Sequence, residues 1–291
     1  MINWRLTTFG ESHGIAVGGV IEGCPSGLKV DRKFITDELA RRATGKTSSE
    51  SQRRESDEVE FLSGLLDDVT LGTPIAFMVR NTDARPEDYE ALKDHYRPSH
   101  ADYTYQAKYG IRDWRGGGRA SARTMLPYVV AGAIAKQLLK QQGIAVHAEV
   151  KSIGGETEPA KIEALLMKCR SEGDSVGGVV HGSITGLPAG LGEPLDDKFQ
   201  ACLAKAMFTI PAVKGFEYGD GFGSASMKGS QLRSSGGALG GITDGNEFTF
   251  NVAFKPIPTI GRGNRHDVCA LPRAVVIVEA MAALTAIRFM K

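Results

Sequence analysis

Cysteine is scarce in this chain of 291 residues: there are four, and no two of them form a CxxC pair. Isolated thiols are typical of a reducing compartment, so we expect no disulfide framework and no cysteine-held metal ion. The first 14 residues lack the apolar core of a signal peptide, and no apolar run approaches the roughly 20 residues that a membrane-spanning helix needs. These absences predict a cytoplasmic protein that makes no contact with a membrane.

An excess of charge of either sign is also missing. There are 35 lysines and arginines against 34 aspartates and glutamates, which gives a formal net charge of +1. Such a chain has no overall field to attract nucleic acid, so nucleic acid is not an expected partner. The chain also lacks a P-loop, a GxGxxG turn that leads into a helix, and an HExxH pair. Any anion must therefore be held by local clusters of arginine.

Glycine, by contrast, is abundant, with 36 copies that often stand in doublets or triplets. Glycine takes up positive φ and lets the backbone approach a ligand closely. Turns in a strand-rich protein account for many of these positions. Where arginine follows at once, as in the run 116–119 (GGGR), the pattern is typical of an anion-binding loop.

Hydrophobic periodicity predicts one continuous domain whose two halves have a loosely similar order of elements. Helices are expected over 31–42, 124–142, 159–171, 196–208 and 272–290. Strands are expected over 3–9, 15–22, 59–65, 74–79, 144–152, 176–185 and 246–254. The polar segments 43–57 and 83–102 are expected to be loops. This order predicts an α+β fold with helices packed against antiparallel sheets and with pseudo-repeated halves.

The stretch GESHG at residues 10–14 fits the GxSxG pattern of a serine-hydrolase nucleophile elbow. In such an elbow a helix follows the serine directly, whereas residues 15–22 alternate and contain two glycines, which is typical of a strand. A serine hydrolase built on Ser12 is therefore a disfavoured alternative, and a tight turn with a solvated histidine is another.

Histidines and arginines gather in the polar loops. His13, His100 and His266 stand there among charged or polar neighbours and are candidate proton carriers near neutral pH, whereas His95, His147 and His181 have no such company. Guanidinium groups bind phosphate and carboxylate through a bidentate fork. The residues alone indicate an enzyme that acts on a phosphorylated and carboxylated small molecule. A phosphate-binding module without catalysis, using the GGGR loop, is the alternative.

Seven blocks of the chain resemble, in family order, the corresponding blocks of chorismate synthases. They are TTFGESHG (7–14), RPSHADYTYQAKYGIRDWRGGGRASAR (97–123), GDSVGG (173–178), LPAGLGEP (187–194), SSGGALGGITDG (234–245), FKPIPTI (254–260) and RHDVCALPRAVVIVEAM (265–281). The blocks span nearly the whole chain, and the second is long and highly specific. The resemblance implies a β-α-β sandwich and a homotetramer.

The resemblance also implies a reaction, the last step of the shikimate pathway of aromatic amino acid biosynthesis. Members of the family convert 5-enolpyruvylshikimate 3-phosphate to chorismate and phosphate by a 1,4-anti elimination. They need reduced FMN although no net redox change occurs, because the flavin is thought to lend an electron and take it back. NADPH is needed only where the enzyme reduces its own flavin.

Matched to the family position by position, three residues have implied catalytic roles. His13 serves the flavin side of the site, His100 protonates the departing phosphate, and Asp267 works with flavin N5 to remove the substrate proton. The implied ligands of the substrate anions are Arg42, Arg97, Arg123 and Arg265. The implied FMN contacts are Arg119, Ala120, Ser121, Gly240, Lys255, Pro256, Ile257, Pro258, Thr259 and Arg265. No metal is implied.

The chain departs from the family pattern in residue types and in length. Ala120 stands where serine is common, and Pro211 stands where asparagine is common, so two polar groups near the flavin are absent. The chain is also shorter than its family. We expect that mobile loops are missing near 43–50, 123–124, 233–234 and 260–264.

Overall fold

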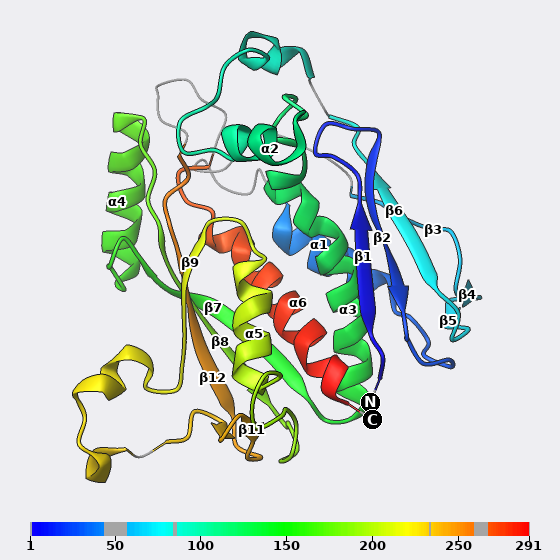
Figure 1. Cartoon of the computed structure of the whole chain (residues 1–291), viewed down its shortest axis with the longest axis vertical. Coiled ribbons are helices and arrows are strands. Elements are labelled where there is room, and N and C mark those ends of the chain that lie inside the picture. The colour runs from blue at the N-terminus through cyan, green and yellow to red at the C-terminus, as the bar shows by residue number, and fades with distance from the viewer. Residues whose placement is uncertain (1, 44–56, 84–85, 233, 259–266, 291) are drawn as a thin grey trace.

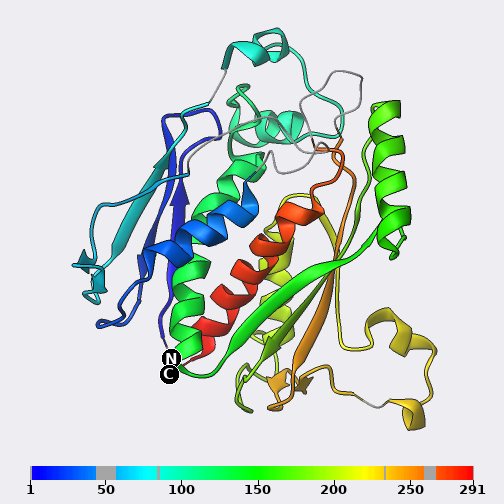
Figure 2. The ribbon, with the colours of Figure 1, turned by 180° about the vertical axis from the view of Figure 1, so that it is seen from behind.

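The protein is a sandwich of two antiparallel sheets with a layer of helices between them (Figures 1 and 2). The computed structural model describes residues 2–43, 57–83, 86–232, 234–258 and 267–290. The first sheet contains, in spatial order, β1 (Arg5–Phe9), β2 (Ala16–Glu22), β6 (Ile75–Arg80) and β3 (Val59–Phe61). The second contains β7 (Ala145–Ile153), β8 (Gly178–Thr185), β12 (Phe248–Phe254) and β9 (Val213–Tyr218).

The two sheets repeat one topology. Ranked along the chain, the strands of each sheet have the spatial order first, second, fourth, third. A helix follows the second strand, a two-stranded hairpin precedes the fourth, and a long helix ends each half. These helices are α1 (Arg32–Arg42), α3 (Leu126–Gln141), α5 (Phe199–Phe208) and α6 (Leu271–Phe289), and the hairpins are β4–β5 (Leu65–Leu66, Val69–Thr70) and β10–β11 (Ala238–Leu239, Ile242–Thr243). The predicted α+β fold is confirmed.

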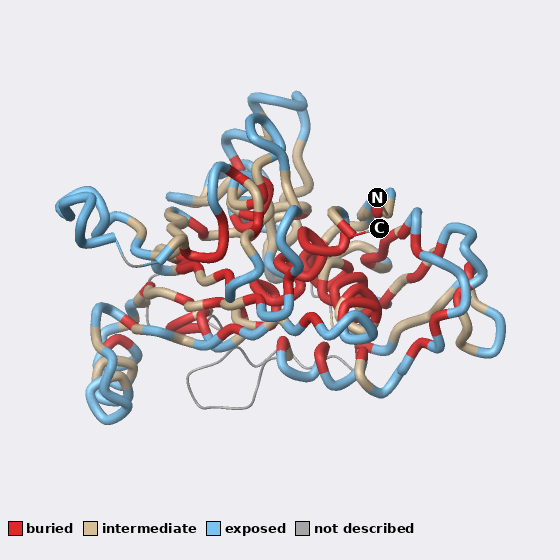
Figure 3. The backbone as a smooth tube through the Cα atoms, turned by 90° about the horizontal axis from the view of Figure 1, so that it is seen from below, coloured by how far each residue is buried: buried red, intermediate tan, exposed pale blue. Residues whose placement is uncertain are grey.

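The helical layer is the core of the molecule (Figure 3). α3 and α6 pack side by side, one facing the first sheet and the other facing the second. A Cβ on Gly132 of α3 would lie 2.5 Å from the Cβ of Ala280 on α6, so only glycine permits this approach. The small alanine side chains of α6 thus allow the neighbouring helices and strands to pack closely against it.

Some elements differ from the sequence prediction. The segment 83–102 was expected to be a loop, but it contains the 3₁₀ helix η1 (Pro86–Leu92), and α2 (Asp102–Tyr109) begins at its end. The helix expected from residue 124 begins with the 3₁₀ turn η3 (Ala122–Met125), because Ser121 caps that turn by accepting from the Arg123 N–H. The helix expected from 196 begins at Phe199.

The remaining differences lie outside the expected elements. Strand β9 was not predicted, since Gly215 interrupts its apolar pattern. The helix α4 (Pro159–Glu172) agrees with expectation, and the short 3₁₀ helices η2 (Gly118–Ala120), η4 (Gly221–Ser226) and η5 (Gly229–Gln231) were not expected. The missing loops stay a prediction, and three of the four places, near 43–50, 233–234 and 260–264, fall largely outside the described residues.

An ion cluster around the buried carboxylates of Glu279 and Glu38 joins the helices. Glu279 of α6 accepts hydrogen bonds from both Nη atoms of Arg41 on α1, at 2.6 and 2.7 Å, and from Nζ of Lys136 on α3, at 2.6 Å. Its other oxygen also accepts from the backbone N–H of Ala148 in β7, at 3.1 Å. Glu38 binds the same two cations. Burial disfavours the charge of Glu279, but the hydrogen bond from Arg41 and the charge of Lys136 prevail and lower its pKa.

We expect Glu279→Gln to lower the free energy of unfolding by about 2 kcal/mol, because Arg41 and Lys136 lose the buried carboxylate that they share and keep only Glu38 as a counter-ion. The lowered pKa also predicts that this stabilisation is present above the ordinary pKa of 4.5 and is lost as the pH falls through the folded value. Urea titrations of both proteins between pH 3 and pH 7 measure both effects. The gap between wild type and variant should narrow below about pH 4.5.

Glu60→Gln is the matched control, because Glu60 pairs with Arg80 on the exposed edge of the first sheet, at 2.7 Å. Exposed pairs contribute about 0–1 kcal/mol, so this variant should unfold almost as the wild type does. An equal loss of unfolding free energy in the two variants would show that the cluster around Glu279 stabilises the fold no more than an exposed ion pair does.

Candidate active site

The predicted site residues come mainly from two equivalent connections in the repeated fold. In the first half, the segment between β6 and α3 holds His100 and the GGGR run; in the second half, the segment between β12 and α6 holds Asp267. Both connections lie at the same end of the molecule as the β1–β2 turn, which carries His13 (Figure 1). The duplicated topology therefore gathers these segments at one end.

The GESHG stretch is a turn between two strands, as its context predicted. Ser12 is fully buried; its Oγ donates to the carbonyl of Gly116 at 3.2 Å and lies 3.0 Å from Nδ1 of His13. A Cβ on Gly116 would lie 2.0 Å from the imidazole of His13, so the triplet and this ring pack directly together. No helix follows Ser12, and its buried hydroxyl is not placed as a hydrolase nucleophile.

Two of the predicted substrate arginines meet at one carboxylate that the sequence did not reveal. Nη2 of Arg42 lies 2.6 Å from Oδ2 of Asp57, and Nη1 of Arg123 binds the other oxygen. All three side chains are buried. Burial disfavours the charge of Asp57, but the two guanidinium groups outweigh this effect and lower its pKa. Asp57 thus joins two arginines that lie 15 and 66 positions away from it in the chain.

Arg97 is held differently. Its backbone N, Nε and Nη2 all donate to the carboxylate of Asp102, at 2.8–3.0 Å. Burial opposes the charge of Asp102, yet the hydrogen bonds from Arg97 lower its pKa to about 2. This clamp closes the RPSHAD segment into a loop around His100. Ser99 within it has φ +58°, a conformation that L-residues rarely adopt.

The loop fixes the tautomer of His100. Its Nδ1 lies 2.9 Å from the carbonyl oxygen of Pro98, and because a carbonyl only accepts, Nδ1 must carry a proton. Proton exchange is then left to Nε2 of this half-buried ring.

Asp267 is buried at the start of the segment that leads into α6, and its carboxylate lies 2.9 Å from Nη1 of Arg273. The residues Lys255 to Pro258 follow β12 at the same end of the molecule. Their backbone is fixed by the Lys255 N–H, which donates to Ala212, and by Ser175, whose Oγ donates to Ile257. Thr259, Arg265 and His266 lie outside the described residues.

The residues after the glycine triplet are anchored to the GESHG turn. Nη1 of Arg119 donates to the carbonyl of Gly10 at 2.9 Å, and Nη2 donates to Oγ of Thr8 at 2.6 Å. Ala120 completes η2, and Ser121 caps the next turn. Hydrogen bonds thus hold Arg119 and Ser121, two of the implied flavin contacts, in place.

Gly240 is not brought to these residues within one chain. It lies in the turn of the β10–β11 hairpin, at the end of the molecule opposite α2 and the β1–β2 turn (Figure 1). A site that uses both Gly240 and Arg119 needs more than one copy of the chain.

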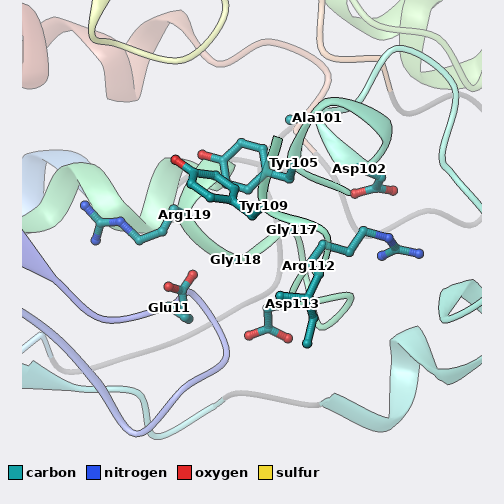
Figure 4. A pocket seen from close by; sticks show the side chains of 11 residues that line it. Glu11, Ala101, Asp102, Tyr105, Tyr109, Arg112, Asp113, Gly117, Gly118 and Arg119 are labelled. Carbon is teal, nitrogen blue, oxygen red and sulfur yellow. The ribbon is translucent and has the colours of Figure 1, made fainter. Parts of the chain in front are cut away.

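A cavity of about 450 Å³ opens beside the GGGR loop (Figure 4). Glu11 and Arg119 lie near each other at one side of it, and the rings of Tyr105 and Tyr109 line it next to them. Burial raises the pKa of Glu11, an effect that Arg119 opposes and Asp113 reinforces. His13, His100 and Asp267 are not among its lining residues.

No group of three or more His, Cys, Asp or Glu side chains within the described residues could hold a metal ion. None of the helices described is both long and apolar enough to cross a membrane.

Comparison with known proteins gives matches along nearly the whole chain. The family described as chorismate synthase matches residues 4–290. The chorismate synthase of Christiangramia forsetii is 46% identical over 334 aligned positions, which cover 97% of this chain and 94% of the relative. That of Parabacteroides distasonis is 44% identical over 343 positions, covering 99% and 96%. Both alignments are longer than the 291 residues of this chain, so the relatives contain segments that it lacks.

A solved structure described as a crystal structure of chorismate synthase has the same fold, with a TM-score of 0.80 at 29% identity. The match covers 98% of this chain and 91% of the other. With the family match and the relatives above, this establishes that the chain belongs to the chorismate synthase family of lyases.

Proposed function

We propose that this chain converts 5-enolpyruvylshikimate 3-phosphate to chorismate and phosphate by 1,4-anti elimination in the presence of reduced FMN. The observation that supports it most is the convergence of Arg42 and Arg123 on one point, at the end of the molecule that carries His13 and His100. A substrate with two carboxylates and one phosphate needs paired, planar cations of this kind.

The proposed anion ligands differ in the aspartate to which each is already bound. Arg42 and Arg123 share Asp57, so a substrate carboxylate can replace a contact that is chemically identical. Arg97 already gives its backbone N–H, Nε and Nη2 to Asp102 and serves better to shape the His100 loop than to bind substrate. Arg265 stays a proposed ligand from the family resemblance.

His100 is the proposed acid for the leaving phosphate. Because Nδ1 is committed to Pro98, the imidazolium would release its proton from Nε2. His13, held between Ser12, Tyr89 and Gly116, is the proposed partner on the flavin side. Asp267, with one oxygen fixed by Arg273, is the proposed acceptor of the substrate proton.

The described residues fit a flavin phosphate or an anionic reduced ring. The three glycines 116–118 all have positive φ, and a Cβ on Gly116 or Gly117 would collide with His13 or approach Arg97 to 3.1 Å. We propose that Arg119, Ser121 and Lys255 to Pro258 hold FMN, with Ala120, Thr259 and Gly240 as further contacts. Bound there, the reduced flavin would supply electron density to the allylic system as phosphate leaves. NADPH enters only if this chain reduces its own flavin.

We propose further that the working form is a homotetramer. The support is the position of the Gly240 hairpin, at the end of its own chain opposite the other proposed flavin contacts. The four buried cysteines are all free, which is in keeping with the reducing cytoplasm.

The direct test is an anaerobic assay that follows chorismate absorbance after substrate is added to the purified chain. We expect chorismate to form with reduced FMN and not with oxidised FMN or without flavin. Turnover that persists without flavin would contradict the proposal. Binding of substrate without turnover would favour a phosphate-binding module, and labelling of Ser12 by a fluorophosphonate would favour a hydrolase.

We expect His100→Ala to lower kcat by about 10²–10⁴-fold, since a general acid is removed. His147→Ala is the matched control, because His147 is exposed on β7 and is predicted to have no role. Steady-state kinetics and near-UV circular dichroism of both variants measure the effect and verify the fold. Wild-type kcat in His100→Ala would remove this residue from the mechanism.

We expect Arg42→Lys to raise KM for the substrate about 10-fold, or 1.4 kcal/mol, because lysine keeps the charge but not the bidentate fork. Arg41→Lys is a neighbouring control, since Arg41 points to Glu279 and Glu38 instead of Asp57. Arg41→Lys should unfold more easily and keep its KM. A rise in KM that is equal in both variants would speak against Arg42 as a substrate ligand.

A further inference from the structure

Asn81, which directly follows β6, forms hydrogen bonds through both ends of its side-chain amide to two parts of the candidate site. Its Nδ2 donates to the carbonyl of Glu11 at 3.0 Å and to that of Gly14 at 2.8 Å. Its Oδ1 accepts from Nε of Arg123 at 3.0 Å. The backbone N–H of Asn81 adds a fourth bond, to the carbonyl of Ile15, at 3.0 Å.

These partners leave the amide only one orientation. The two carbonyls accept and cannot donate, so they require the NH₂ group, while Arg123 donates and cannot accept, so it requires the oxygen. Aspartate would face the carbonyls with a second acceptor, and alanine would satisfy neither side. An asparagine amide is the side chain of this size that supplies both kinds of bond.

The two carbonyls lie on either side of His13 in the chain. With both ends of the GESHG turn tied to Asn81, the turn is fixed on that side. Ser12 fixes it on another through Gly116, and Arg119 through Gly10. The other end of the amide reaches the guanidinium of Arg123, which also binds Asp57. One side chain thus links the turn of a proposed proton carrier to a proposed substrate ligand.

We infer that Asn81 is a positioning residue, which sets the imidazole of His13 and the guanidinium of Arg123 in a fixed relation while binding neither substrate nor flavin itself. The inference rests on the proposed function, in which both of those residues take part. It assigns to Asn81 an effect on kcat that is transmitted through the turn.

The decisive variant is Asn81→Asp. Its carboxylate can keep the bond to Arg123 but repels the carbonyls of Glu11 and Gly14, so the turn shifts while the substrate arginine stays in place. We expect kcat to fall by about 100-fold, since a displacement of about 1 Å can cost that much, and KM to change less than about threefold. A loss of packing alone would not separate the two constants in this way.

The second readout needs no turnover. In a ¹H–¹⁵N spectrum of the histidine side chains, the His13 signal, assigned with His13→Ala, should move in Asn81→Asp, while the His147 signal should not. An unmoved His13 signal together with wild-type kcat overturns the inference. If His13→Ala keeps full activity, the proposed function of His13 fails instead, and the spectrum still tests whether Asn81 positions the ring.

Asn251→Asp is the matched control. Asn251 is a buried amide that uses both ends of its side chain. Its Nδ2 donates to Glu217 at 3.0 Å, and its Oδ1 lies 3.0 Å from Nδ1 of His181. It lies on β12 in the second sheet, away from the candidate site. This variant should lose stability and keep wild-type kcat. If Asn81→Asp does not fold, Asn81→Ser replaces it: a hydroxyl can donate to only one carbonyl, so kcat should fall about 10-fold, and full activity would overturn the inference.

Discussion

The close contact between α3 and α6 is the constraint on which the candidate site depends. Each helix ends one half of a repeated topology, and the strand–helix connection before it carries site residues. Because Gly132 meets Ala280 without an intervening side chain, the two helices lie together in the middle layer. Their N-terminal ends, and so the two connections, are held at the same end of the molecule (Figure 2). The ion cluster at Glu279 fastens α1 to the same pair.

Aspartates of the chain itself partly neutralise the charge of the site arginines. Asp57 stands between Arg42 and Arg123, and Asp102 stands beside Arg97. Buried guanidinium groups without counter-ions would repel one another and carry a heavy desolvation cost. These aspartates explain how a chain of net charge +1 can concentrate arginines at one end. In the proposed function, an anionic substrate would therefore exchange with a carboxylate instead of filling a bare cationic pocket.

The sequence predicted the sheets, the main helices and the paired halves, because strong periodicity and an apolar core decide these features locally. It could not predict α2, whose polar residues 102–109 carry little helical pattern, or β9, which contains a glycine. In the site, histidines and arginines were visible as residue types in polar loops. Asp57, Asn81 and Asp102 were not, because carboxylates and amides are common in loops and only the fold shows which cation or carbonyl each one meets.

The division of the site between elements suggests how its parts keep their geometry. His13 lies on a short turn of the first sheet, which could move independently of the η3 turn that carries Arg123. A polyanionic substrate that displaces Arg123 would not displace His13 with it unless contacts within the chain couple the two residues. The coupling available in the described chain is short and polar: Arg119 reaches back to Gly10, Ser12 reaches to Gly116, and Asn81 joins Arg123 to both ends of the turn. Hydrogen bonds from side chains to fixed backbone carbonyls tolerate little displacement, so in the proposed function binding energy gained at the arginines would help to orient the imidazole.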